Sequence, residues 1–262
     1  MVLGAPLATC SSIQQWRRET MKSYRGNAIA VGVLFILCSV ASILSIVPLG
    51  ATVSAPVDFA KLAESDSAVV MTALIEFVWA ATGMGIAIAL YPVLRLFNPT
   101  LALGSVAGRV VENVLILLGT LSLLALLTVS QQAAGSAAPA SFQSTGDALV
   151  AVREWAPGFV AGLAFVVGTF LYNFVMYRSR LVPRWLSGWG LVGAVLSLVA
   201  YLYIGFTQDF GFTTVNNVLS APIGLQEMVL AVWLIVKGFN QSAVRSIAPS
   251  TVHSTTPVGL DL

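Results

Sequence analysis

Residues 101–129 have the sequence LALGSVAGRVVENVLILLGTLSLLALLTV, which is apolar apart from two charged side chains, Arg109 and Glu112. A bilayer core about 30 Å thick needs about 20 apolar residues in an α-helix. This stretch exceeds that length, and it predicts a helix that crosses a membrane. Five further stretches have the same character, and they cover about residues 28–49, 68–94, 155–177, 185–206 and 218–236.

The predicted fold class is therefore all-α: a polytopic membrane protein built as a bundle of six transmembrane helices. Prolines mark two of the turns, with Pro92 and Pro99 between the second and third spans and Pro183 between the fourth and fifth. Residues 131–145 are rich in Ala, Ser and Gln, which predicts a mobile loop outside the membrane.

Composition supports this class and excludes two others. The chain has 262 residues, of which 57% are hydrophobic and 9% are charged. A soluble domain has about 25% charged residues, so this chain could not cover a water-soluble globule with polar surface. The net charge of +2 is too small for a nucleic-acid binder, which needs many basic contacts to phosphate. The apolar surface must face lipid, and the bilayer is the first expected partner.

Basic residues predict the orientation of the bundle, because cytoplasmic connections carry an excess of Lys and Arg. One set of segments holds most of them: Arg17, Arg18, Lys22, Arg25, Arg95, Arg178, Arg180, Arg184, Lys237 and Arg245. The opposite set holds Lys61 and Arg153, and it is mildly acidic. Both termini are therefore expected in the cytoplasm, which agrees with an even number of spans.

Three regions follow from this organisation. Residues 1–27 are expected to form a cytoplasmic segment, and its basic part at 12–25, with Trp16 and Tyr24, is typical of a short helix lying on anionic lipid. Residues 28–240 form the transmembrane domain. Residues 241–262 are polar and are expected to be a disordered cytoplasmic tail.

Residue counts limit the chemistry. The chain has one histidine, His253, and two cysteines, Cys10 and Cys38, so a zinc site with three or four converging ligands is not expected. A Ser-His-Asp triad within the membrane and a Gly-x-Ser-x-Gly nucleophile motif are also not expected. The sequence thus favours a protein that is not an enzyme and predicts neither a metal nor a cofactor.

Small residues recur at helical spacing near the starts of the third and fourth spans. Gly104 and Gly108 lie four apart, as do Gly158 and Gly162. This spacing lets helix backbones approach closely, and ordinary packing within the bundle is the favoured interpretation over a specific dimer face.

Several local strings together resemble a bacterial membrane protein family, domain of unknown function 4386. They are YPVLR at 91–95 with FNP at 97–99, GRVVE at 108–112, RSRLVPRWL at 178–186, Gly190, QEM at 226–228 and WLIVKGFN at 233–240. The resemblance covers about residues 28–240. It implies six helices in a bacterial cytoplasmic membrane, and it implies no established activity and no catalytic residue.

Ionisable residues within the predicted spans form the candidate site. A charged side chain at membrane depth costs about 2.5–3.5 kcal/mol on insertion scales, so it is expected to face the bundle interior. The candidate polar cluster comprises Glu76, Arg109, Glu112, Asn113, Tyr172, Asn173 and Glu227. A second candidate group, Arg178, Arg180 and Arg184, could bind anionic lipid headgroups or serve only as an orientation signal.

Two interpretations of the cluster stay open. Arg109 could hold carboxylates from different helices together and fix the register of the bundle, since a guanidinium binds carboxylates in a planar fork. Alternatively, three acids facing one base leave a carboxylate unpaired, and such a group can carry a proton or bind a cation.

These interpretations lead to different functions. The first hypothesis is a small ion-coupled transporter or permease of an unknown ion or small molecule, with a homo-oligomer as one option. The alternative is a non-catalytic membrane scaffold or envelope-stress component that acts through partner proteins. An intramembrane enzyme that uses carboxylates on a lipid substrate is the least favoured hypothesis.

Overall fold

The computed structural model describes residues 10–49, 53–211 and 213–245 of the chain. Within these ranges the regular structure is helical, and no strand forms. Six helical segments are long and apolar enough to cross a membrane: Tyr24–Leu44, Asp66–Leu94, Pro99–Ala134, Pro139–Ser179, Arg184–Thr207 and Thr214–Val236. The prediction of an all-α polytopic membrane protein with six spans is confirmed.

The spans are formed by α1 (Cys10–Leu44), α3 (Asp66–Leu94), α4 (Pro99–Ala134), α6 (Ala161–Ser179), α7 (Arg184–Thr207) and α8 (Thr214–Val236). The fourth span begins earlier, with α5 (Gln143–Trp155) and a π-helical turn, η2 (Ala156–Val160), which lead directly into α6. Three short helices flank the spans: α2 (Phe59–Glu64), η1 (Pro139–Phe142) and α9 (Gln241–Arg245).

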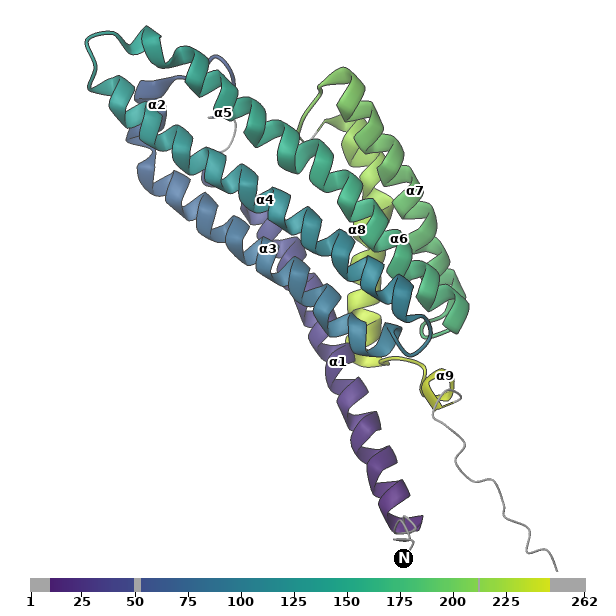
Figure 1. Cartoon of the computed structure of the whole chain (residues 1–262). Helices are drawn as coiled ribbons and strands as arrows, with labels where there is room; N and C mark the ends of the chain where they lie inside the picture. Colours follow the sequence, from purple (N-terminus) through teal and green to yellow (C-terminus); the bar gives the residue numbers. More distant parts are fainter. Residues whose placement is uncertain (1–9, 50–52, 212, 246–262) are drawn as a thin grey trace, which may run out of the picture.

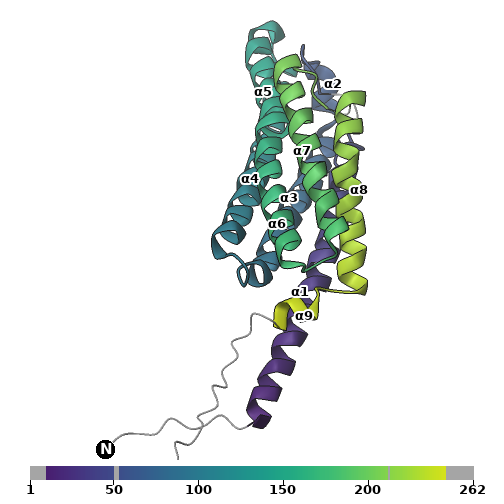
Figure 2. The same cartoon turned by 90° about the vertical axis from the view of Figure 1, so that its right-hand side faces the viewer.

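The six long helices close into a ring (Figures 1 and 2). Each helix packs against the next, in the order α1, α3, α4, α6, α7 and α8, and α8 packs back against α1. The α4–α6 contact is close because glycines face each other: a Cβ added to Gly108 would lie 2.7 Å from the Gly168 nitrogen. The small-residue spacing predicted from sequence thus serves packing within the chain.

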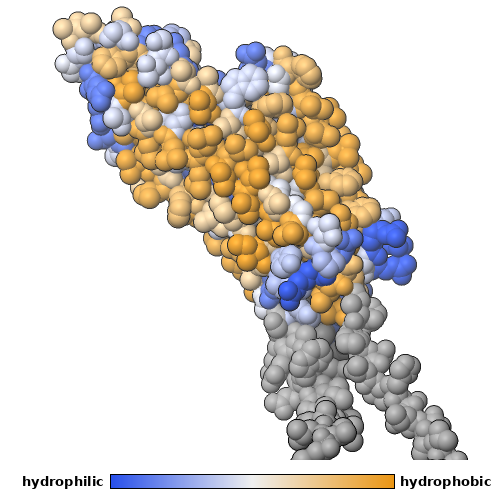
Figure 3. Space-filling view, viewed as in Figure 1, coloured by the Kyte–Doolittle hydropathy of each residue, from blue (hydrophilic) through white to orange (hydrophobic). Residues whose placement is uncertain are grey.

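The surface of this ring is apolar between two polar ends. In Figure 3 a broad orange band covers the middle of the molecule, and blue residues gather at both ends. Large apolar side chains point outward from this band, among them Ile43, Leu74, Phe77, Leu121 and Val192. Such an exposed apolar belt would be unstable in water, and it provides the contact with the lipid bilayer.

The two ends of the bundle differ in what they carry. One end carries the N-terminal part of α1, the turns after α3 and α6, and α9, and we call it the proximal end (Figure 1). The opposite end carries α2, η1 and the link between α7 and α8, and we call it the distal end. The first and last described segments, at Cys10 and Arg245, are thus on the same side of the bundle.

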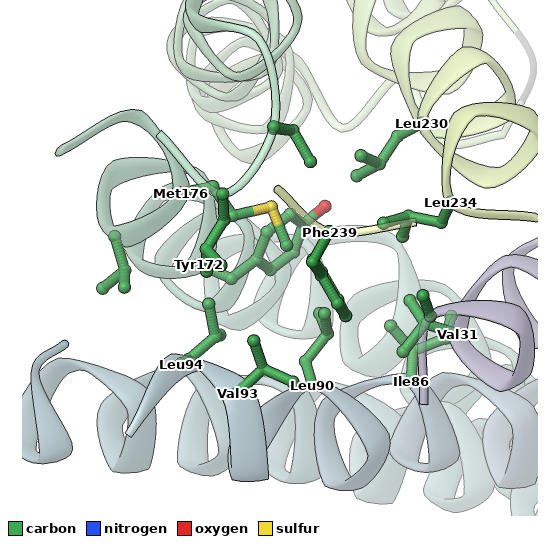
Figure 4. Close-up of a cluster of buried hydrophobic side chains, with 14 of the residues drawn as sticks. Val31, Ile86, Leu90, Val93, Leu94, Tyr172, Met176, Leu230, Leu234 and Phe239 are labelled. Carbon is green, nitrogen blue, oxygen red and sulfur yellow. The ribbon is translucent and has the colours of Figure 1, made fainter. Parts of the chain in front are cut away.

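A large apolar core fills the proximal end, and we call it the proximal cluster (Figure 4). Most of its buried members come from α1, α3, α6 and α8, and α4, α7, α9 and the turns after α6 and α8 add others. The members include Val31, Phe35, Ile86, Leu90, Leu94, Tyr172, Met176, Leu230, Leu234 and Phe239. A smaller distal cluster joins α3, α4 and α5 through Val69, Leu123, Leu126 and Val150. The space between the two clusters holds the polar residues described below.

The contact between α1 and α8 completes the ring. Arg25 donates hydrogen bonds to the carbonyls of Leu234, Ile235 and Val236, at distances of 3.2, 2.6 and 3.3 Å. These carbonyls belong to the last turn of α8, where intrahelical donors run out, although the Leu234 carbonyl also accepts from the Gly238 amide at 3.1 Å. A cation is favourable at that end of a helix dipole. Gly238 follows with φ of 74°, a conformation that glycine adopts without strain.

Three segments differ from the sequence-based expectations. Residues 131–145, predicted to be a loop, contain the end of α4, η1 and the start of α5. Residues 12–25 are continuous with the first span instead of forming a separate helix, and the side chains of 10–23 lie outside the described part, so their contact with lipid stays a prediction. Residues 241–245 form α9, whereas 246–262 of the expected disordered tail lie outside the described residues.

Candidate functional site

A partly open cavity of about 180 Å³ lies between the six spans. Every span contributes to its lining, through Cys38 of α1, Trp79 of α3, Glu112 of α4, Phe165 of α6, Tyr201 of α7 and Glu227 of α8. A volume of this size holds several water molecules or one small solute. The cavity is therefore a property of the whole bundle and not of one helix pair.

The proximal cluster closes one side of this cavity. Along α1 the cluster residues Val31 and Phe35 precede the lining residue Cys38, and along α8 the lining residue Glu227 precedes Leu230 and Leu234. Because α1 and α8 run in opposite directions, both orders place the cluster on the proximal side. Solute in the cavity is thus separated from the proximal end by packed apolar side chains.

Arg109 and Glu112 form a buried ion pair on the wall of the cavity. The Arg109 Nη1 atom lies 3.0 Å from Glu112 Oε2 and 3.3 Å from Oε1. The two residues are three apart on α4, as the sequence predicts, and they are 2% and 6% exposed. The guanidinium also lies over the ring of Phe165, with 5.2 Å between its Cζ atom and the ring centroid. The charge of Arg109 is therefore compensated locally by Glu112.

Hydrogen bonding within this ion pair is incomplete. Among the described residues, neither Arg109 Nε nor Glu112 Oε2 has a hydrogen-bond partner that meets normal geometry, although both atoms are buried. Buried polar atoms without partners are costly, so such atoms in a cavity wall are suited to a polar ligand or water.

Glu227 is the second carboxylate of the cavity and has a different environment. It accepts a hydrogen bond of 3.1 Å from the hydroxyl of Tyr172, which joins α8 to α6. Tyr172 is 1% exposed, and Figure 4 shows its ring among the side chains of the proximal cluster. Glu227 is in no ion pair among the described residues, since the pairs found there are Arg109–Glu112 and Arg153–Glu76. The charge imbalance in the sequence predicts one unpaired carboxylate among three acids without saying which; Glu227 is the one outside the described ion pairs.

Glu76 pairs with Arg153 and not with Arg109. The prediction that Glu76 shares a cluster with Arg109 is therefore wrong. The Glu76 carboxylate accepts hydrogen bonds from both terminal nitrogens of Arg153, one of them at 2.8 Å, and from the Thr120 hydroxyl at 2.6 Å. Glu76 is not among the residues that line the cavity. The remaining cavity charges are one base and two acids.

The position of Arg153 explains this difference. The fourth span predicted from the sequence begins only at residue 155, which puts Arg153 in a connection outside the membrane. In the structure α5, η2 and α6 form a continuous helical segment that packs along α4, so Arg153 reaches the carboxylate on α3. Residues 143–155 contain apolar side chains at helical spacing, such as Val150. This pattern is the sequence signal from which an earlier start of the fourth span could have been predicted.

Asn113 and Asn173 are placed as contacts between helices. The Asn113 amide donates to the Arg109 carbonyl at 2.6 Å, and its side chain occupies the space left by Gly83 of α3. The Asn173 amide donates to the Thr169 carbonyl at 3.0 Å, and its side chain fills the space beside Gly190 of α7. Neither asparagine lines the cavity.

Arg178, Arg180 and Arg184 are exposed at the proximal end, away from the cavity. The Arg184 guanidinium lies over the ring of Tyr177, with 5.4 Å to the ring centroid. Arg180 ends α6 in a left-handed conformation, with φ of 56°. Their binding to lipid headgroups stays a prediction.

The aromatic side chains of the cavity are not among the residues predicted from the sequence. Trp79, Phe165 and Tyr201 line it from three helices. Nothing in the sequence distinguishes them from aromatic residues that face lipid, since both surfaces of a transmembrane helix are apolar. Within the described ranges, no three His, Cys, Asp or Glu side chains come together as a metal site would require.

Comparison with known proteins identifies a family. A family model described as a domain of unknown function, DUF4386, matches residues 30–238 of the chain. The resemblance drawn from the local strings is therefore confirmed. Comparison with curated proteins and comparison with solved structures each gave no match.

Proposed function

Because the chain belongs to the DUF4386 family, a domain of unknown function, we propose its activity from the cavity itself: it is a small ion-coupled transporter or permease. The observation that carries this proposal is the position of Glu227, a carboxylate outside any described ion pair, in a cavity to which all six spans contribute. Intramembrane carboxylates of this kind mark ion pathways in transporters.

The two carboxylates of the cavity have separate roles in this proposal. Glu112 is held by Arg109 and remains a fixed part of the wall. Glu227 is free to exchange a proton or a cation, with the Tyr172 hydroxyl as a donor that stabilises its negative charge. The proximal cluster separates this group from one side of the membrane, so alternating access requires that the cluster open.

The proposed location is the cytoplasmic membrane of a bacterium, with the proximal end facing the cytoplasm. The exposed residues of that end include Arg95, Arg178, Arg180 and Arg184, whereas the distal end carries Asp58, Glu64 and Asp66. The excess of basic residues supports this orientation through the positive-inside rule.

Proton flux through reconstituted protein tests the proposed function. Liposomes that contain a pH-sensitive dye and the purified protein are given an inward membrane potential or a pH gradient. We expect proton entry above the rate of empty liposomes, and we expect Glu227→Gln to abolish it. The matched control is Glu64→Gln, which removes an exposed carboxylate on α2. Equal rates for wild type and empty liposomes under both gradients would contradict the proposal.

The alternative function is a non-catalytic scaffold that acts through partner proteins. The Glu76–Arg153 pair favours a structural role for that part of the predicted cluster, because it joins α3 to α5 and neither residue lines the cavity. A partner that co-purifies in mild detergent, together with an absence of proton flux, would support the scaffold.

A further inference from the structure

We infer that the cavity binds a small organic ammonium cation, which pairs with the Glu227 carboxylate and displaces a proton from it. This inference rests on the proposed function and names the substrate class of the same site. It follows from the charge of the cavity, from the chemistry of its walls and from its size.

The charge of the cavity favours a cation. The charged side chains of its lining are Arg109, Glu112 and Glu227. The single positive group is neutralised by Glu112 at 3.0 Å. Glu227 then supplies an uncompensated negative charge whenever it is ionised. An anionic solute would be repelled by the Glu227 carboxylate and would find no unpaired cationic side chain in the lining. A neutral solute would leave the Glu227 charge unpaired.

The chemistry of the walls favours an organic cation over a metal ion. A divalent cation such as Ca²⁺ needs about six to eight converging oxygen ligands, and no group of three acidic, His or Cys side chains gathers in the described chain. The cavity instead presents the aromatic side chains of Trp79 and Tyr201 together with the carboxylate of Glu227. Aromatic faces attract ammonium groups, and the attraction is strongest where water is excluded.

The size of the cavity limits the ligand. At about 180 Å³ it is smaller than the sites of about 300–1,000 Å³ that take drug-sized ligands. A monoamine or a small quaternary ammonium ion suits this volume, whereas a polycyclic cation does not. The apolar remainder of the lining, including Ile116 and Ala161, would contact its alkyl groups.

The exchange step is balanced in atoms and charge. The protonated Glu227 carboxyl loses its proton to water, and the incoming ammonium ion forms an ion pair with the resulting carboxylate, so one positive charge replaces another. The ionisable groups around Glu227 are Arg109 and Glu112 of α4, Tyr172 of α6, Tyr201 of α7 and Cys38 of α1. Proton and cation compete for one carboxylate, and acid therefore weakens cation binding.

The test measures binding by calorimetry with the protein in lipid nanodiscs. The probes are tetramethylammonium and methylammonium chloride, compared with sodium acetate and with sodium chloride at the same ionic strength. We expect binding of at least one ammonium probe at pH 8 and an affinity about tenfold lower at pH 5.5. Glu227→Gln should weaken binding on the order of 30-fold, since it removes the anionic partner of the bound cation. Glu64→Gln should bind like the wild type.

The pH dependence of the wild type keeps the inference falsifiable if Glu227→Gln does not fold. Stronger binding of acetate than of either ammonium probe would overturn the inference, as would ammonium binding that is insensitive to pH or to Glu227→Gln. Proton flux without ammonium binding would overturn this substrate class and leave the proposed transport intact. Ammonium binding without any proton flux, when the same ammonium salt is present on one side of the liposomes, would support the site and contradict transport.

Discussion

Arg153 and Glu76, separated by 77 positions in the chain, form a bidentate ion pair that joins α5 to α3 and is completed by the Thr120 hydroxyl of α4. Three helices thus meet at one carboxylate, which is 4% exposed in its side chain. Breaking a buried pair leaves an uncompensated charge, whereas replacing both partners by apolar residues removes the charge altogether.

The first prediction concerns this pair. Arg153→Ala should destabilise the protein by about 3–5 kcal/mol, because Glu76 stays buried without its cation. The double change Arg153→Met with Glu76→Leu should recover most of that loss. The free energy of unfolding in mixed micelles measures both effects. A double variant as unstable as Arg153→Ala would show that the pair is needed for more than charge compensation.

The second prediction concerns the close approach of α4 and α6. Gly108→Ala should lower stability by about 1–3 kcal/mol, since the new Cβ would lie 2.7 Å from the Gly168 nitrogen and 3.1 Å from the Ala164 carbonyl oxygen, both of which are backbone atoms. Gly224→Ala is the matched control, because no heavy atom beyond the neighbouring backbone of its own helix lies within 4 Å of its added Cβ. The measurement is the folded fraction after size-exclusion chromatography and the unfolding free energy. Equal losses for both variants would refute the packing argument.

The third prediction concerns Tyr172. Tyr172→Phe keeps the ring in the proximal cluster and removes the hydroxyl that donates to Glu227. We expect a loss of stability of about 0.6–1.7 kcal/mol, the range for hydrogen bonds between membrane helices, and a changed rate of proton flux. Flux and unfolding are measured on the same preparation. A stable variant with wild-type flux would exclude a role of this hydroxyl in the site.

The fourth prediction concerns orientation. In a background with Cys10→Ser and Cys38→Ala, a cysteine replacing Asp209 at the distal end should react with a membrane-impermeant maleimide added to intact cells. A cysteine replacing Arg180 at the proximal end should react only after the membrane is opened. The opposite pattern would show that the proximal end faces outward, against the distribution of basic residues.

The sequence predicts the spans well, because the length of an apolar helix is set by the thickness of the bilayer. It also predicts the Arg109–Glu112 pair, since residues three apart share a helix face. It cannot assign Glu76 to Arg153, because that contact depends on how far α5 continues the fourth span and on the register of two helices. Contacts between helices distant in the chain require the bundle itself.

The residues that line the cavity are also only partly predictable from the sequence. Its aromatic residues carry no mark in the sequence, because in a membrane the buried face and the lipid face of a helix are equally apolar. Charged residues stand out against this background, which is why Glu112 and Glu227 were identified and Trp79 and Tyr201 were not. In such proteins the charged residues of a site can therefore be predicted from the sequence, whereas the apolar and aromatic residues that line it cannot.

The closure of the ring by Arg25 has a consequence for biosynthesis. Arg25 and its acceptor Leu234 are 209 positions apart, so at about 5–20 residues per second the ribosome needs about 10–40 s to supply the partner. During that time the side of α1 that later meets α8, including Gly32, is without its partner helix. The first span to enter the bilayer is thus among the last to be enclosed, and the cavity exists only once translation of α8 is complete.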